Sequence, residues 1–207
     1  MRNLKLPVIT LVILVLNLIG YVLELTLGSN QILYDYGMYQ GALQDGEWYR
    51  LITSSFLHFD PIHLLCNMFC LVSFGMLLED GIGRIRFTGI YVAGILGAGL
   101  FIQYAGGPYS LHAGASGAIW ALMGAALVYI LKYHGSPVGI IRSILLNLFY
   151  SFSSGVSWQG HIGGGIAGLA AALILLNLKP PKNGKAYRKW KKSHPGVSDE
   201  FFNTRDE

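Results

Sequence analysis

The sequence is short of charged residues. Lys, Arg, Asp and Glu together make up 13% of the 207 residues, whereas 53% are hydrophobic. An average soluble protein contains about 25% charged residues. This shortage indicates that lipid is the main solvent of the chain. It favours one compact membrane domain and excludes a second folded domain.

Cysteines and metal-binding patterns are also scarce. The two cysteines, Cys66 and Cys70, are four positions apart in an apolar run, where a disulfide within one helical turn would have poor geometry. The chain contains no H-E-x-x-H motif, and His58 and His63 are five apart, which is not the usual spacing of helical zinc ligands. We therefore expect no metal and no cofactor.

Six apolar stretches are long enough, or nearly so, to cross a bilayer as helices, which takes about 17–25 residues. Open sheet edges cannot be satisfied in lipid, so the sequence predicts an all-α membrane protein. We expect a six-helix membrane domain over residues 1–178, with a long outer connection at 28–59, and a basic, disordered tail over 179–207. The predicted spans are 7–27, 61–78, 87–105, 115–131, 137–152 and 162–178.

The basic residues predict the orientation of these spans. Of the 15 Lys and Arg residues, 14 lie on one side, and Arg50 is the exception. The positive-inside rule then places both termini in the cytoplasm, as in a multi-pass protein of a bacterial inner membrane. Residues 7–27 exceed the length of a signal-peptide core and lack an A-x-A site, so we expect a retained span. The basic tail favours an anionic lipid surface over nucleic acid.

A serine between small residues opens the fourth predicted span, in the sequence Gly114-Ala115-Ser116-Gly117. The start of a helix offers unpaired N–H donors to a developing oxyanion, and small neighbours let a substrate backbone come close. In isolation, small residues in a membrane helix more often serve packing.

His161 stands at the opening of the sixth predicted span. Gly164 and Gly168 follow it by three and seven positions, so they share its helical face and let another helix approach closely. An ionisable residue inside the membrane is by default a functional candidate. The alternative is a histidine that bonds only to a backbone carbonyl.

His63 and Asn67 share one face of the second predicted span. They are either a polar pair that joins helices or two donors of a site. With the N-terminus inside, the second, fourth and sixth spans all run inward, so His63, Ser116 and His161 reach a similar depth near the outer face. A serine, a histidine base and further donors are the minimum set for acyl transfer. No aspartate in the spans is placed to orient His161, which favours a dyad over a triad.

Together, these motifs resemble the rhomboid family of intramembrane serine proteases over about residues 47–178. The resemblance implies a six-transmembrane-helix rhomboid-like bundle that cleaves transmembrane proteins in the bilayer; it specifies no oligomeric state. It also implies the role of each motif residue. Ser116 is the nucleophile and His161 the general base, His63, Asn67 and the Ser116 backbone amide form the oxyanion hole, and Gly114, Gly117, Trp120, Gly164 and Gly168 support them.

Two positions depart from the family pattern. Tyr49 precedes Arg50 where the family often has tryptophan, and Trp120 stands four residues after Ser116 where the family commonly has tyrosine or phenylalanine. Both replacements remain aromatic, and neither removes a catalytic group.

Two other functions remain open from the sequence. One is a proteolytically inactive, rhomboid-like chaperone of membrane proteins. The other is a small multi-pass transporter, which would need ionisable residues along a central path. The carboxylates of Glu24, Glu79 and Asp80 lie near span ends, and the middles of the predicted spans contain no carboxylate, which disfavours the transporter.

Overall fold

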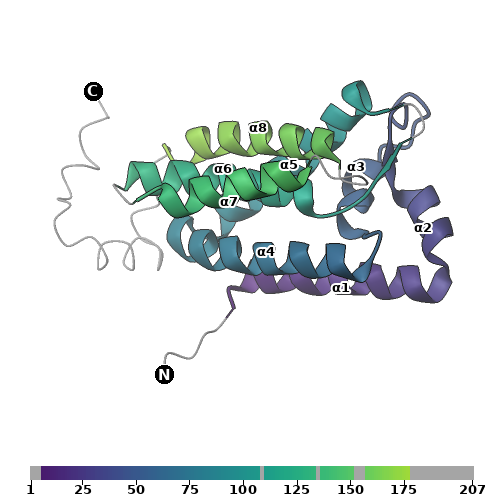
Figure 1. The fold of residues 1–207 in the computed structure, drawn as a ribbon, viewed down its shortest axis with the longest axis horizontal. Helices are drawn as coiled ribbons and strands as arrows, with labels where there is room; N and C mark the ends of the chain where they lie inside the picture. Colours follow the sequence, from purple (N-terminus) through teal and green to yellow (C-terminus); the bar gives the residue numbers. More distant parts are fainter. Residues whose placement is uncertain (1–5, 108–109, 134–135, 152–156, 178–207) are drawn as a thin grey trace.

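The computed structural model describes residues 6–107, 110–133, 136–151 and 157–177, and over this part the chain is mostly helical (Figure 1). The basic tail predicted at 179–207 lies outside the described residues. The long helices are α1 (Val8–Leu27), α4 (Pro61–Ile82), α5 (Arg84–Ala105), α6 (Ser116–Lys132), α7 (Val138–Ser151) and α8 (Trp158–Leu175). Shorter elements are α2 (Ser29–Tyr36), β1 (Met38–Tyr39), α3 (Arg50–Thr53), the 3-10 helix η1 (Ser54–Phe56) and β2 (Leu111–His112).

Within the described residues, four helices are long and apolar enough to cross a membrane: α1, α4, α5 and α8. The shorter helices α6 and α7 are also apolar. The prediction of a helical, multi-pass membrane protein is therefore confirmed, while the count of six spans stays a prediction.

Helix boundaries differ from those predicted by up to four residues. α8 begins at Trp158, four residues before the predicted span, because the Ser157 hydroxyl caps its first turn by accepting from the Gly160 amide. His161 therefore lies inside the first turn of the helix. α4 and α5 almost touch end to end, because Gly83 alone separates them with a φ of 87°, a conformation that glycine adopts at no steric cost.

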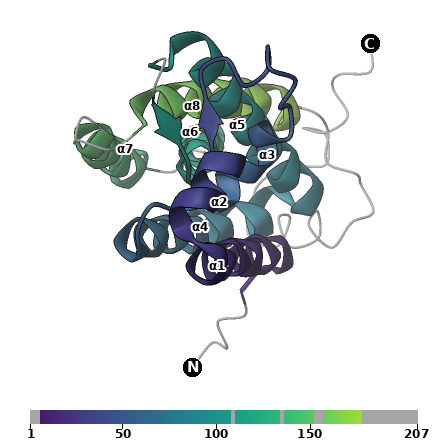
Figure 2. The ribbon, with the colours of Figure 1, turned by 90° about the vertical axis from the view of Figure 1, so that its right-hand side faces the viewer.

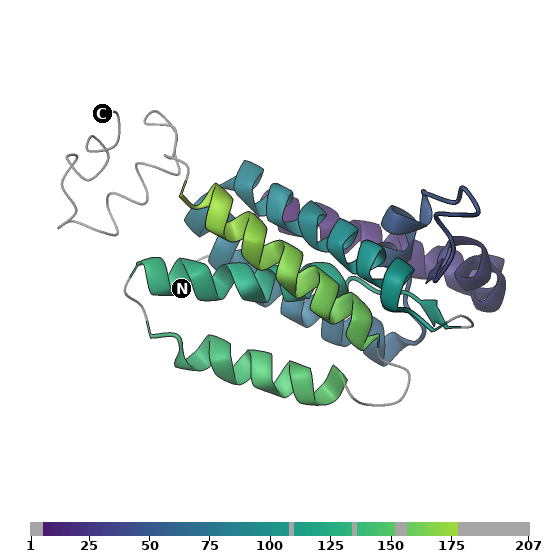
Figure 3. The same ribbon diagram turned by 90° about the horizontal axis from the view of Figure 1, so that it is seen from above.

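The helices form two groups that lie side by side (Figure 1). α1 lies along α4, and α5, α6 and α8 pack together above this pair. α7 stands to one side of the bundle (Figures 2 and 3), with α6 as a packing neighbour. The beginning of α1 and the end of α8 lie at one end of the molecule, and α2 and α3 gather at the other.

Glycines bring α6 and α8 into backbone contact. A methyl group at Gly164 would collide with the carbonyl oxygen of Gly117, and one at Gly168 would collide with Ala121. In a bilayer, small residues allow helices to associate through close packing. The glycine face of α8 predicted from the sequence is thus the surface that packs against α6.

A buried carboxylate joins α1 to α4 at the end where α1 begins. Glu79 accepts hydrogen bonds from the Ile9 amide at 3.0 Å, the Thr10 amide at 2.8 Å and the Thr10 hydroxyl at 2.9 Å. The first amides of a helix have no partner within the helix, so Glu79 supplies one to α1. The sequence placed Glu79 near a span end but did not reveal this structural role.

The outer connection at 28–59 is ordered by contacts with the segment before α6. β1 pairs antiparallel with β2, so that Met38 lies opposite His112 and Tyr39 opposite Leu111. The buried Arg50 guanidinium donates to Glu47 and to the carbonyl oxygens of Tyr34 and Gly37. The connection is therefore fastened to the chain that leads to Ser116.

The contact between α6 and α8 predicts different effects of alanine at two adjacent glycines. Gly164→Ala should lower the thermal unfolding midpoint in detergent, because overpacking of this kind costs about 1–3 kcal/mol. Gly165→Ala is the matched control, because its new methyl group would meet only Trp120 Cε3 at 3.6 Å, an ordinary contact. Equal midpoints for the two variants would contradict the proposed importance of the contact.

Candidate active site

Ser116 is the first residue of α6 and is half-buried. The preceding loop turns at Gly114, whose φ of 127° lies in the region that L side chains rarely adopt. The Gly114 amide donates to the Ser54 carbonyl oxygen at 2.9 Å. The start of α6 is thus held against η1, and Ser116 stands in the first turn of the helix, whose amides have no partner within the helix.

His63 and Asn67 present polar atoms to Gly114 from the first turns of α4. A Cβ atom added at Gly114 would lie 2.8 Å from His63 Cε1, 2.9 Å from His63 Nε2 and 3.8 Å from Asn67 Nδ2. Asp60 caps α4 by accepting from the His63 amide at 2.8 Å, and Asn67 Nδ2 donates to the His63 carbonyl oxygen at 3.0 Å. The absence of a side chain at Gly114 therefore leaves room for these donors beside the Ser116 loop.

His161 is buried in the first turn of α8 and stacks on Trp120 of α6. The two ring centroids are 5.3 Å apart, and the ring planes are inclined by 21°. The backbone contact between Gly164 and Gly117 lies next to Ser116 and about one turn from His161. Two independent contacts thus fix the imidazole relative to α6.

One cavity of about 910 Å³ contains all four polar residues predicted for the site, Ser116, His161, His63 and Asn67. The structure therefore brings together the residues that the predicted topology placed at similar depth. Their catalytic roles stay predictions. Trp120 also lines the cavity, whereas Gly114, Gly117, Gly164 and Gly168 act through the contacts described above.

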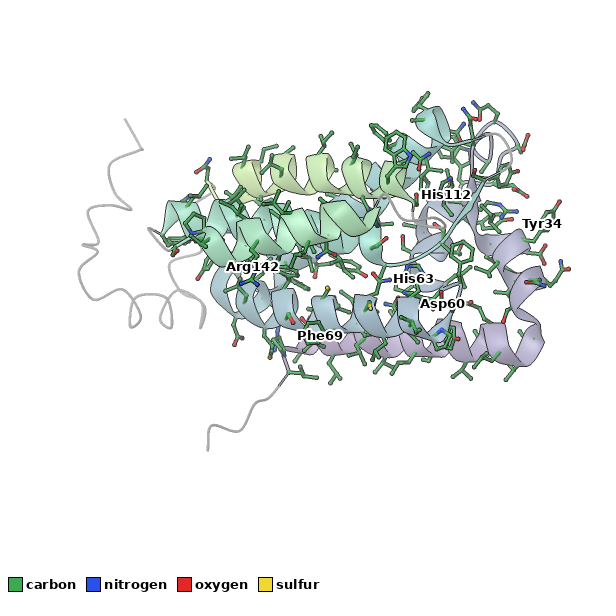
Figure 4. The ribbon with its side chains drawn as sticks, viewed as in Figure 1. Tyr34, Asp60, His63, Phe69, His112 and Arg142 are labelled. Atoms are coloured by element: carbon green, nitrogen blue, oxygen red, sulfur yellow. The ribbon has the colours of Figure 1, made fainter. Side chains whose placement is uncertain are left out.

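The cavity extends from this polar end between α4 and α7. Its wall includes Phe69 on α4 and Leu146 on α7, which are 72% and 62% exposed. Figure 4 shows His63 and Asp60 near the beginning of α4, with Phe69 farther along the same helix. The cavity thus joins the polar residues to the apolar flank of the protein. Cys66, Cys70 and Asn147 also line it.

Sequence reasoning missed a buried pair next to His63. Glu24 of α1 is 0% exposed, and its Oε1 accepts from the His58 amide at 2.9 Å. The His58 ring is 1% exposed and meets the His63 ring edge to face, with centroids 5.0 Å apart. Burial, followed by the neighbouring His63, lowers the pKa of His58 to about 3, so this ring is neutral at pH 7. An ionisable residue within an apolar stretch was the available signal.

The described residues contain no group of three or more His, Cys, Asp or Glu side chains that could hold a metal ion. The groups that line the cavity include a hydroxyl at a helix start, an imidazole, and two side-chain donors. This set can perform acyl transfer, in which the hydroxyl attacks a carbonyl and donors stabilise the resulting oxyanion.

Comparisons with known proteins agree on one family. The family model of the Rhomboid domain matches residues 45–178. The chain is 38% identical to Rhomboid protease GluP of Bacillus subtilis (strain 168) over 76% of its length and 32% of that protein. It is 35% identical to RHOMBOID-like protein 6, mitochondrial, of Arabidopsis thaliana, over 70% of its length and 49% of that protein. Rhomboid protease AarA of Providencia stuartii is 29% identical, over 81% of the chain and 73% of AarA.

Proposed function

The chain belongs to the rhomboid family, and on this basis we propose that it is an intramembrane serine endopeptidase that works through a dyad of Ser116 and His161. The observation that carries the proposal is the shared cavity, in which the serine and histidine meet two donors at the end of a membrane helix bundle. The substrates are transmembrane proteins, and no cofactor takes part.

The reaction follows from the placement of these groups. His161 takes the proton of the Ser116 hydroxyl while its oxygen attacks the scissile carbonyl. The oxyanion accepts hydrogen bonds from the Ser116 backbone amide, His63 Nε2 and Asn67 Nδ2. His161 then returns the proton to the leaving amine, and a water molecule, activated by the same imidazole, hydrolyses the acyl-enzyme.

The proposed topology has six spans, with α6 and α7 as the shorter two, and both termini in the cytoplasm. The first and last described helix ends lie at the end of the bundle opposite α2 and α3 (Figure 1). Arg84, the first residue of α5, and Lys132, the last residue of α6, are basic residues expected at an inner surface. The active site then opens near the outer face of an inner membrane, and residues 1–178 form the protease domain.

Substrates enter from the lipid between α4 and α7. A substrate that is itself a membrane helix cannot readily leave the bilayer, so the cavity must be reached from the side. The wall between α4 and α7 is apolar at Phe69 and Leu146 and leads to Ser116 and His161. α7 stands apart from the other helices (Figure 3), which makes it the wall that moves most easily.

Substitutions in the site should separate catalytic groups from donors. Ser116→Ala and His161→Ala should abolish cleavage of a transmembrane substrate in liposomes, and the double variant should be no worse, because the pair acts as a unit. His63→Ala and Asn67→Ala should each lower kcat by about 10²–10³, the usual cost of one oxyanion donor.

Serine-directed fluorophosphonate labelling provides a second measurement for the same variants. The wild type should be labelled, and Ser116→Ala should not. Ser73→Ala is the matched control, because Ser73 lies on the exposed face of α4 and donates to the Phe69 carbonyl oxygen. Clear cleavage by purified Ser116→Ala would exclude the dyad.

The topology predicts which engineered cysteines face outward. In a protein with Cys66 and Cys70 replaced by serine, Ser110→Cys should react with a membrane-impermeant thiol reagent in intact cells. Asn183→Cys, in the predicted inner tail, should react only after the cells are broken. The reverse pattern would overturn the orientation, and with it the outer position of the site.

The side entrance predicts an effect of a bulky group at Cys66, which is exposed and lines the cavity. With Cys70 replaced by serine, attaching a large maleimide to Cys66 should slow cleavage of a transmembrane substrate at least tenfold. A short soluble peptide should be affected less, because it can reach Ser116 from the water. Protein with both cysteines replaced, treated in the same way, is the control. Unchanged cleavage of the transmembrane substrate after complete labelling would exclude this route.

A further inference from the structure

Glu24 is a fully buried carboxylate that the proposed mechanism does not use. It lies one turn from the end of α1, a mostly apolar helix, and is 0% exposed. A carboxylate buried among membrane helices is costly unless polar groups satisfy it. An ionisable residue in such a position is by default a candidate for a functional role.

A hydrogen bond joins Glu24 to the segment just before α4. Its Oε1 accepts from the His58 amide at 2.9 Å, in a buried hydrogen bond between residues 34 positions apart. Glu24 Oε2 and both ring nitrogens of His58 have no hydrogen-bond partner among the described residues. Buried polar atoms without partners reduce stability, so stability alone does not account for the pairing of these two residues.

The segment that is hydrogen-bonded to Glu24 also contacts the His63 ring. The His58 ring lies 5.0 Å from the His63 ring at an interplanar angle of 65°. The Phe59 ring lies 6.2 Å from it and is nearly parallel, at 10°. The His63 ring therefore has two consecutive aromatic residues as neighbours, while its Cε1 and Nε2 atoms lie nearest to Gly114.

We propose that Glu24 is a positioning residue for hydrolysis, which anchors His58 and Phe59 so that His63 Nε2 stays directed at the oxyanion. The inference rests on the proposed function. The hydrogen bond from the His58 amide fixes the backbone, the two rings transmit this position, and His63 makes the contact with the reacting oxygen. An oxyanion donor stabilises the transition state only when it is held in place beforehand.

Glu79 provides a matched control for Glu24. It is also a buried carboxylate, is 4% exposed, and joins α1 to α4. Its three hydrogen bonds lie at the opposite end of α1, away from the cavity that contains Ser116. Replacing either residue by methionine removes the carboxyl oxygens that accept these hydrogen bonds, at nearly constant volume.

The test compares Glu24→Met and Glu79→Met in the wild type and in His63→Ala, with kcat, KM and the unfolding midpoint measured for each protein. In the wild type, Glu24→Met should lower kcat about tenfold with little change in KM, since a small misplacement of a catalytic group costs up to about 10². In His63→Ala it should lower kcat no further. Glu79→Met should lower the unfolding midpoint, and its effect on kcat should be the same in both backgrounds.

Two results would overturn the proposal: unchanged kcat in Glu24→Met, or the same loss of kcat with and without His63. If Glu24→Met fails to fold, Phe59→Leu is the deciding variant, because Phe59 is 41% exposed and its replacement tests the same contact with His63. Its loss of kcat should likewise vanish in His63→Ala. Failure of the proposed function would be distinct, because Ser116→Ala would then cleave as well as the wild type.

Discussion

The backbone contact between α6 and α8 sets the separation of the two proposed catalytic residues. Ser116 is one residue from Gly117, and His161 is three residues from Gly164, so the closest approach of the helices lies next to the pair. Even one added methyl group would push the helices apart. Acyl transfer tolerates only displacements of the reacting groups that are well below about 1 Å. The glycines at this contact therefore serve the reaction geometry as well as helix association. Stacking of Trp120 on His161 adds a second constraint from the same helix.

Helix starts fix the remaining polar groups. Asp60 caps α4 just before His63, and Ser157 caps α8 just before His161. A side-chain cap defines the residue at which a helix begins, so each histidine occupies a fixed place in a first turn. In lipid, an uncapped helix end would be more costly than in water. The side chains that cap the backbone amides of α4 and α8 therefore also place His63 and His161 at the starts of these helices.

The sequence predicted the residues of the site better than the contacts that hold them. Spacing alone put Gly164 and Gly168 on the face of His161, and the charge pattern put His63, Ser116 and His161 at similar depth. The pairing of Glu24 with His58 could not be predicted, because the two residues are 34 positions apart and no pattern links them. Likewise, the early start of α8 depends on the Ser157 hydroxyl. Ser157 lies in a polar stretch, and the hydrophobicity of that stretch does not indicate at which residue the helix begins.

Gly114 explains why the outer connection matters to a site formed by helices. Its amide is held by the Ser54 carbonyl oxygen, and the Ser54 hydroxyl donates to the Arg50 carbonyl oxygen at 2.6 Å. Arg50 is itself buried and bound to Glu47. The loop that carries Ser116 is therefore fixed from the outer connection, while the donors that face it come from α4. Because Gly114 lacks a side chain, the loop that carries Ser116 and the donors of α4 can lie close together without displacing each other. The position of Ser116 therefore depends on this connection and on α4, and not on α7.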